Sequence, residues 1–184
     1  MEPSFKFIIV RDVHVPTRAN AGDAGIDFYV PNDLTIEDMV KANSKNDQLI
    51  NINFVQDKAN ITKIILQPHS RIIIPSGILG ILEPEASMLQ ANNKSGVSSN
   101  GGIIFSAEVV DSGYLGEIHL GVINTGQHAY VIEAGKKLVQ FVHVPIYLTQ
   151  PELICGSEFT KLKTEKELKS GRGSDGMGSG KETL

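Results

Sequence analysis

The chain has 184 residues, a length typical of one domain with its own core, and 41% of its residues are hydrophobic. Its formal net charge of -4 at pH 7 argues against a general binder of nucleic acid or membrane surfaces. The one cysteine, Cys155, excludes an internal disulfide. No run approaches the ~20 apolar residues of a membrane span, and no basic leader precedes the first apolar run. We therefore expect a soluble, cytoplasmic protein.

Short apolar runs rich in Ile and Val follow one another along the chain and predict strands. They cover residues 5–10, 26–30, 61–66, 71–74, 77–82, 102–110, 116–124, 129–133 and 137–146. Turn signals separate several of them, at Gly113, Thr125-Gly126 and Ala134-Gly135. Many short strands at such intervals indicate an all-β domain: an antiparallel sandwich, barrel or jelly roll.

Two segments depart from the strand pattern. Residues 33–60 are polar and mixed in charge, and TIEDMVKA within them could form a short helix. Residues 156–184 are rich in Lys, Glu, Gly and Ser, which indicates an arm. We therefore expect a β domain over residues 1–155, with 33–60 as an insertion, and an arm over 156–184.

The glycine-rich stretch RGSDGMGSGK (172–181) has the look of a phosphate-binding Walker loop. That motif needs a glycine five positions before Gly180 and a Ser or Thr after the lysine. Asp175 and Glu182 occupy those positions, so the stretch does not match the motif.

Four other pieces carry polar residues within or beside strands. They are AGDAGIDFYVP (21–31), NNKSGVSSNGGI (92–103), VVDSGYLGEI (109–118) and GKKLVQF (135–141). Together with the glycine-rich stretch, they occur in the order and approximate spacing of five motifs of the trimeric dUTPases, and the chain resembles that family over residues 15–30 and 70–180.

The resemblance implies a distorted jelly-roll or β-clip barrel that assembles as a homotrimer with active sites shared between subunits. It implies hydrolysis of dUTP to dUMP and pyrophosphate. By its motif position Asp111 is the general base that activates the attacking water at the α-phosphorus, although a turn aspartate often only caps local backbone. Tyr114 is the residue that packs against deoxyribose and excludes a 2′-hydroxyl, the alternative being a core aromatic pair.

The remaining motif positions imply contacts with the triphosphate and the base. Lys94, Ser95 and Gly96 match the group that holds phosphate, with lysine where the family usually has arginine. Gln140 matches a residue that orients phosphate or metal-bound water, and Asp27 supports the site from behind. Val109, Val110 and His119 lie near the nucleotide by motif position, although for His119 we favour a strand histidine half in the core.

The glycine-rich stretch is implied to be a lid that closes over the nucleotide, with an arginine as phosphate clamp. The implied contacts of this lid are Arg172, Gly173, Ser174, Met177, Gly178 and Ser179. Met177 stands where the family has a phenylalanine that stacks on uracil, and methionine lacks the aromatic face. The substrate implies Mg²⁺, held mainly by the triphosphate and water with no direct protein ligand.

Two other functions compete with this interpretation. A dCTP deaminase shares the fold, but it needs a glutamate where this chain has Gly121. A dUTPase-like protein with reduced catalysis could instead act as a binding or regulatory protein, with residues 33–60 as the contact surface. The pattern VVDSGY fits either a dUTPase or a dCTP deaminase and does not separate them. The residue that separates the two enzymes is Gly121.

Overall fold

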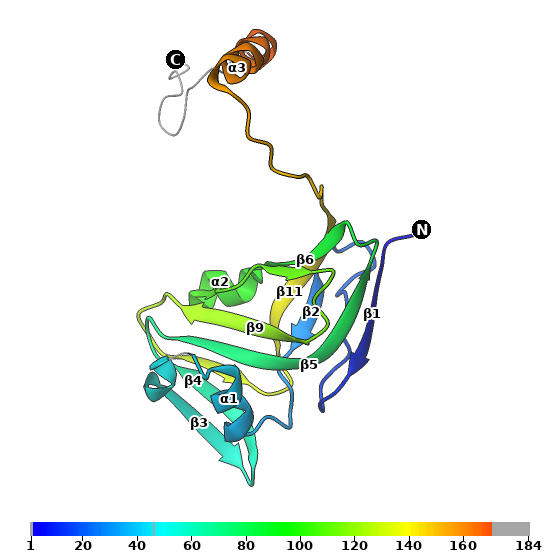
Figure 1. Ribbon diagram of the computed structural model, residues 1–184. Coiled ribbons are helices and arrows are strands. Elements are labelled where there is room, and N and C mark those ends of the chain that lie inside the picture. Colours follow the sequence, from blue (N-terminus) through cyan, green and yellow to red (C-terminus); the bar gives the residue numbers. More distant parts are fainter. Residues whose placement is uncertain (1, 46, 171–184) are drawn as a thin grey trace. The chain divides into compact units, whose positions relative to one another are not determined.

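The computed structural model describes residues 2–45 and 47–170, and it confirms an all-β fold built from antiparallel sheets (Figure 1). The chain divides into two compact units, one up to Tyr147 and one from Leu148. The strands of the first unit are β1 (Ser4–Ile9), β2 (Ile26–Tyr29), β3 (Ile52–Asp57), β4 (Asn60–Leu66), β5 (Arg71–Glu83), β6 (Ser87–Asn92), β7 (Ile103–Phe105), β8 (Val109–Asp111), β9 (Glu117–Asn124), β10 (Tyr130–Glu133) and β11 (Lys137–Pro145). Its helices are α1 (Ile36–Ala42), α2 (Ser95–Gly101) and the 3₁₀ helix η1 (Asp47–Asn51).

Among the described residues the strands form three sheets. Two have four strands each, in the orders β1-β5-β9-β7 and β2-β11-β6-β8, and a third has the order β10-β4-β3. Crossovers such as β2-β11 join strands far apart in sequence. The motif pieces at 21–31 and 135–141 are thereby paired in one sheet, and the piece at 92–103 starts from the end of β6 in the same sheet and continues into α2.

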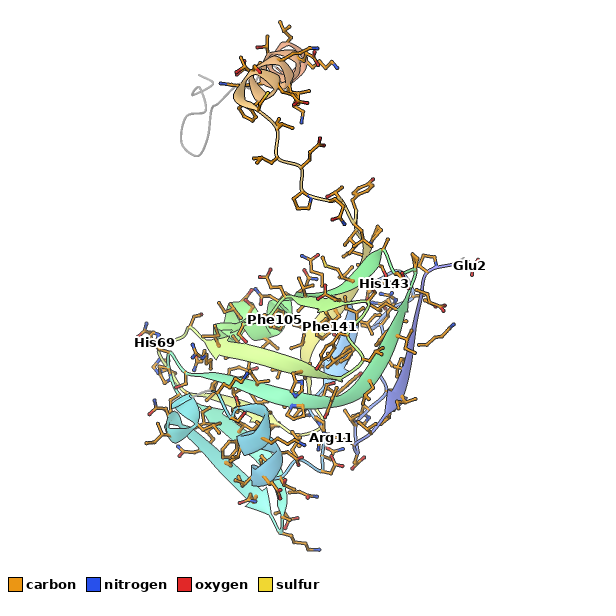
Figure 2. All side chains as sticks on the ribbon, in the orientation of Figure 1. Glu2, Arg11, His69, Phe105, Phe141 and His143 are labelled. Atoms are coloured by element: carbon orange, nitrogen blue, oxygen red, sulfur yellow. The ribbon has the colours of Figure 1, made fainter. Side chains whose placement is uncertain are left out.

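The alternation of the strands explains the core. In β9, Ile118, Leu120 and Val122 are buried while His119 is exposed, as expected for a strand with one face inward. Phe28 of β2 and Phe141 of β11 meet edge to face with centroids 4.7 Å apart, and Phe141 lies inside the first unit (Figure 2). These side chains belong to one continuous hydrophobic cluster.

The insertion is partly regular. The expected short helix is confirmed as α1, which starts at Thr35 with a capping box: Asp38 N donates to the Thr35 side chain, and Thr35 N donates to the Asp38 carboxylate. The Asn43 side chain then pairs with the backbone of Ile73 in β5, donating to its carbonyl at 2.8 Å and accepting from its amide at 2.9 Å. The insertion is therefore fastened to the edge of β5. It also contains β3, which pairs with β4 and which the sequence analysis did not predict.

Three strand predictions differ from the structure. Residues 71–74 and 77–82 belong to one strand, β5, whose register with β9 shifts between Pro75 and Leu79. Residues 102–110 form not one strand but two, β7 and β8, which belong to different sheets because the chain leaves one sheet at Ser106. β6 was missed because SMLQAN lacks the Ile and Val that marked the other strands.

In the second unit, residues 156–170 form the helix α3 (Gly156–Ser170), which the composition of the segment did not suggest. The six predicted lid residues lie outside the described residues, and they are Arg172, Gly173, Ser174, Met177, Gly178 and Ser179. The boundary expected at residue 155 stays a prediction. No helix among the described residues is long and apolar enough to cross a membrane.

Candidate active site

A buried carboxylate stands at one end of the sheet β2-β11-β6-β8. Asp27 is only 3% exposed and accepts from two ammonium groups, Lys94 Nζ at 2.9 Å and Lys137 Nζ at 2.7 Å. Burial alone would raise the pKa of Asp27, but the hydrogen bonds and charges of Lys137 and Lys94 outweigh it and leave the pKa below its ordinary value. Asp27 thus holds two cations side by side.

Gln140 completes this cluster from the neighbouring strand. It lies opposite Asp27 in the register of β11 with β2, and its Nε2 donates to the carbonyl of Asn93 at 2.9 Å. Gly25 makes room for it, since a Cβ at that position would lie 2.5 Å from Gln140 Oε1. The structure therefore brings together Asp27, Lys94 and Gln140, three of the residues selected from sequence. Ser95 and Gly96 follow at the start of α2.

Lys137 was missed by the sequence analysis. The resemblance to the trimeric dUTPases carried this signal: their motif at this place reads G-x-R-I-A-Q, and Lys137 stands at the position of its arginine in GKKLVQ. Its Nζ also lies 5.7 Å from the centre of the Tyr29 ring. The hydrogen bond to Asp27 raises the pKa of Lys137, so this side chain stays a cation at neutral pH.

The second polar group forms the hairpin that joins β8 to β9. Asp111 is exposed at the end of β8, and its carbonyl accepts from the amide of Tyr114 at 3.0 Å to close the turn. The Tyr114 hydroxyl donates to the carbonyl of Glu117 at 2.9 Å. Gly116 lies under the ring, where a Cβ would come within 2.6 Å of that hydroxyl. The ring is therefore held flat over the hairpin and 45% exposed.

A hollow of about 490 Å³ lies on the outer face of β5 and β9. Gly121 and Ser106 line it side by side, since a Cβ added to Gly121 would lie 2.3 Å from Ser106 Oγ. His119 lines it and is exposed, so the expectation of a half-buried histidine is wrong. The other lining residues come from β5, from β9, from the segment after β7 and from the insertion: Arg71, Ile72, Ile73, Ile123, Ala107, Ala42, Asn43 and Lys45.

The two polar groups lie apart within one chain. β6 runs between β8 and β11, with Met88 opposite Asp111 and Asn92 opposite Gln140. From Met88 to Asn92, β6 advances by four residues, which span about 13 Å. In addition, β8 and β11 lie on opposite sides of β6, two inter-strand spacings apart. One chain therefore does not place Asp111 against the cluster of Asp27, Lys94 and Gln140.

Val109 is exposed and Val110 half-buried on the same short strand as Asp111.

Comparison with known proteins identifies the family. The sequence profile of the dUTPase family matches residues 57–176. The chain belongs to the dUTPase family. Among its relatives are deoxyuridine 5'-triphosphate nucleotidohydrolases of Bartonella bacilliformis (32% identical, covering 63% of this chain and 68% of the relative), Chlamydia pneumoniae (34%, covering 66% and 79%) and Clostridium kluyveri (27%, covering 91% and 94%).

Solved structures agree in fold with this dUTPase-family chain. The dUTPase of Staphylococcus bacteriophage 80α with dUpNHpp gives a TM-score of 0.65 at 20% identity and covers 96% of this chain and 97% of its own. The dUTPase from phage φ11 of S. aureus gives 0.61 at 17% identity, covering 82% and 96%. The family is one of enzymes, so this dUTPase is a hydrolase of nucleotide metabolism with a jelly-roll fold. The matched residues 57–176 include Lys94, Asp111 and Gln140.

Proposed function

We propose that this enzyme hydrolyses dUTP to dUMP and pyrophosphate, with Asp111 as general base. A water oxygen bonds to the α-phosphorus, the bond from that phosphorus to the oxygen bridging toward the β-phosphorus breaks, and Asp111 takes the proton of the water. The observation that carries the proposal is the pair of cations that Asp27 holds beside Gln140, a phosphate-binding end. Asp111 is exposed at the end of β8, so a water molecule can reach its carboxylate, as a general base requires.

In this proposal Lys94 and Lys137 bind the phosphate chain as point charges. Their side chains keep 28% and 36% of their area exposed, so an incoming triphosphate can reach both ammonium groups. Ser95 and Gly96 offer a hydroxyl and an open backbone next to Lys94, since nothing lies within 4 Å of a Cβ built on Gly96. Tyr114 packs against the deoxyribose, and the hollow lined by His119 and Gly121 takes the base.

The separation of Asp111 from the lysines supports a homotrimer with shared sites. A general base must reach the attacking water within hydrogen-bond distance. Because the register of β6 holds Asp111 and Gln140 of one chain apart, the base of one subunit would act on phosphate held by another.

Magnesium fits this site as a substrate-bound ion. Among the described residues there is no group of three or more His, Cys, Asp or Glu that could hold a metal, and both oxygens of Asp27 are taken by lysines. Mg²⁺ commonly keeps several waters and binds the oxygens of substrate phosphates, so we expect the triphosphate and water to supply its ligands here. A phage φ11 dUTPase is described with a structural Mg(II) ion. When bound to the triphosphate here, the ion would neutralise charge on the phosphates.

Deamination of dCTP is disfavoured at Gly121. That position would have to carry the glutamate that works at the base, but Ser106 Oγ occupies the place of a Cβ. The alternative would show itself as ammonia released from dCTP.

The test is product analysis with dUTP, dCTP and UTP, each with Mg²⁺ and with a chelator. We expect dUMP and pyrophosphate from dUTP alone, at a rate that the chelator lowers. Asp111→Asn should lower kcat by about 10²-fold or more and leave the Kd of dUTP within a few fold, because a general base contributes to the chemical step. Asp57→Asn, at an exposed aspartate at the end of β3, is the matched control and should retain full activity. Unchanged turnover in Asp111→Asn would remove this residue from the role of base.

A further inference from the structure

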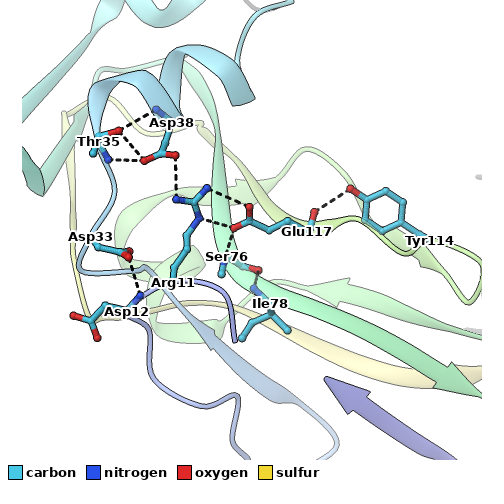
Figure 3. Close-up of polar contacts among 10 residues, drawn as sticks. Arg11, Asp12, Asp33, Thr35, Asp38, Ser76, Ile78, Tyr114 and Glu117 are labelled. Atoms are coloured by element: carbon cyan, nitrogen blue, oxygen red, sulfur yellow. Dashed lines mark hydrogen bonds and ion pairs between the residues drawn. The ribbon is translucent and has the colours of Figure 1, made fainter. Parts of the chain in front are cut away.

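Arg11 joins three parts of the first unit that are distant in sequence (Figure 3). Its guanidinium donates to both carboxylate oxygens of Glu117, at 2.7 Å from Nε and 3.2 Å from Nη2. Its Nη1 donates to Asp38 Oδ1 at 3.0 Å. A planar guanidinium can satisfy two carboxylates in this forked way, whereas a lysine is a single point charge.

Glu117 occupies a gap in the sheet. The pairing of β5 with β9 is interrupted between Pro75 and Leu79, and there the Glu117 carboxylate accepts from the amide of Gly77 at 2.7 Å. Gly77 has a φ of +75°, and a Cβ there would come within 2.9 Å of Arg11 Cβ. Glycine thus allows the arginine to approach. The start of β9 is held by the Glu117 side chain where the backbone ladder is broken.

Glu117 also holds the hairpin that joins β8 to β9. Its carbonyl accepts a hydrogen bond from the Tyr114 hydroxyl at 2.9 Å (Figure 3), and the ring packs against Gly116, the residue that precedes Glu117. A shift of the Glu117 backbone would therefore move the exposed ring. Arg11 fixes the side chain of the same residue.

Asp38 connects this assembly to the insertion. One of its oxygens accepts from Arg11, while the other accepts from the amide of Thr35 at 2.9 Å and from its hydroxyl at 2.7 Å. Burial would raise the pKa of Asp38, but these hydrogen bonds and the charge of Arg11 lower it overall. The first turn of α1 is thereby tied to Arg11 through an ionised carboxylate.

We propose that Arg11 is a positioning residue through which the insertion helix α1 sets the sugar selectivity of the enzyme. The contacts form one chain, from α1 through Asp38, Arg11 and Glu117 to Tyr114. The inference rests on the proposed function, in which Tyr114 discriminates dUTP from UTP. It assigns to the insertion a role within the nucleotide site of its own chain. Such links change coupling by about 0.5–2 kcal/mol, which corresponds to about 2- to 30-fold in a ratio of rates.

The three side chains are between 19% and 25% exposed, so the ion pairs alone could serve stability. Two variants separate that role from positioning. Asp38→Asn keeps an oxygen for Thr35, and so keeps the cap, but turns an amide N–H₂ toward Arg11 and cuts the link. Arg11→Lys keeps the charge and loses the fork. Arg11→Met removes both.

The experiment measures kcat and KM with dUTP and with UTP for wild type, these three variants and Lys63→Met, with thermal unfolding of each. Lys63→Met breaks the Lys63–Glu133 pair, a half-exposed contact between β4 and β10, and serves as control. We expect Asp38→Asn and Arg11→Met to lower the ratio of kcat/KM for dUTP over UTP by about 3- to 10-fold, with Arg11→Lys between them and wild type.

If Arg11 serves stability alone, its replacement would lower the unfolding temperature, while the ratio of kcat/KM for dUTP over UTP would stay at the wild-type value in the folded variants. That result would overturn the inference. The same holds if Lys63→Met changes the ratio as much as Asp38→Asn. The proposed function fails separately, by lack of dUTP hydrolysis in the wild type. If Arg11→Met does not fold, Asp38→Asn decides, since its cap is preserved.

Discussion

Replacing Asp27 by Asn tests whether the buried carboxylate organises the phosphate-binding end of the sheet. The change keeps the shape of the side chain and removes its charge. One amide oxygen remains for one lysine, while the amide N–H₂ faces the other ammonium group. Lys94 and Lys137, at 2.9 and 2.7 Å from Asp27, then lose the anion that holds them together.

The size of the effect follows from burial. Breaking a buried ion pair costs about 3–5 kcal/mol when the remaining charge stays buried, and an exposed pair contributes about 0–1 kcal/mol. Asp27 is buried, but the two lysine side chains are 28% and 36% exposed and can turn toward water. We therefore expect Asp27→Asn to lower the free energy of unfolding by about 1–3 kcal/mol, a loss of about 3–10 °C in Tm.

The assay is urea unfolding of wild type and Asp27→Asn at a fixed protein concentration, because assembly would make stability depend on concentration. The pKa of folded Asp27 lies below the ordinary aspartate value of 3.8, so the carboxylate contributes its full stability above that value. The contribution is lost as pH falls through the folded pKa. The difference between the two proteins should thus be largest near neutral pH and shrink as pH falls below about 3.8. Equal stability at neutral pH, or a difference that persists undiminished in acid, would refute this reasoning.

Two further predictions concern glycines. Gly121→Glu should fill the hollow beside Ser106 and raise the KM for dUTP by about tenfold or more. Product analysis should show no ammonia released from dCTP by this variant. An unchanged KM for dUTP would mean that the base binds elsewhere. Gly80→Ala would set a Cβ 2.2 Å from Phe5 Cε2, so we expect a loss of about 1–3 kcal/mol in urea unfolding, partly recovered by Phe5→Leu in the double variant. Full stability in Gly80→Ala would mean that the ring moves aside freely.

Strand periodicity predicted most of the fold because the strands that form the core carry Ile and Val. β9 and β11 were found by alternation, and their inward residues Leu120 and Phe141 are in the core. β6 is a central strand of its sheet, yet SMLQAN has weak β-propensity and owes its strand state to neighbours on both sides. Tertiary pairing of that kind is invisible in a single segment.

The insertion shows what local signals can and cannot reveal. The capping box in TIED identifies the start of α1, because Thr35 and Asp38 satisfy each other locally. The contact of Asp38 with Arg11 spans 27 positions, and that of Arg11 with Glu117 spans 106. No short motif predicts such pairs, which explains why sequence reasoning left the insertion without a role.

The site itself was predictable only in pieces. Motif order placed Asp27, Lys94 and Gln140 in one list with Asp111, but the order of motifs carries no information about distance. The structure separates them because β6 pairs with β8 at Met88 and with β11 at Asn92. In the proposed mechanism the phosphate-binding cations and the general base act on one phosphorus atom, so that mechanism requires a working site drawn from more than one chain. That requirement links catalysis to assembly: a variant that weakens association should lose turnover with its Asp111 and Lys94 intact, and dilution should lower its specific activity.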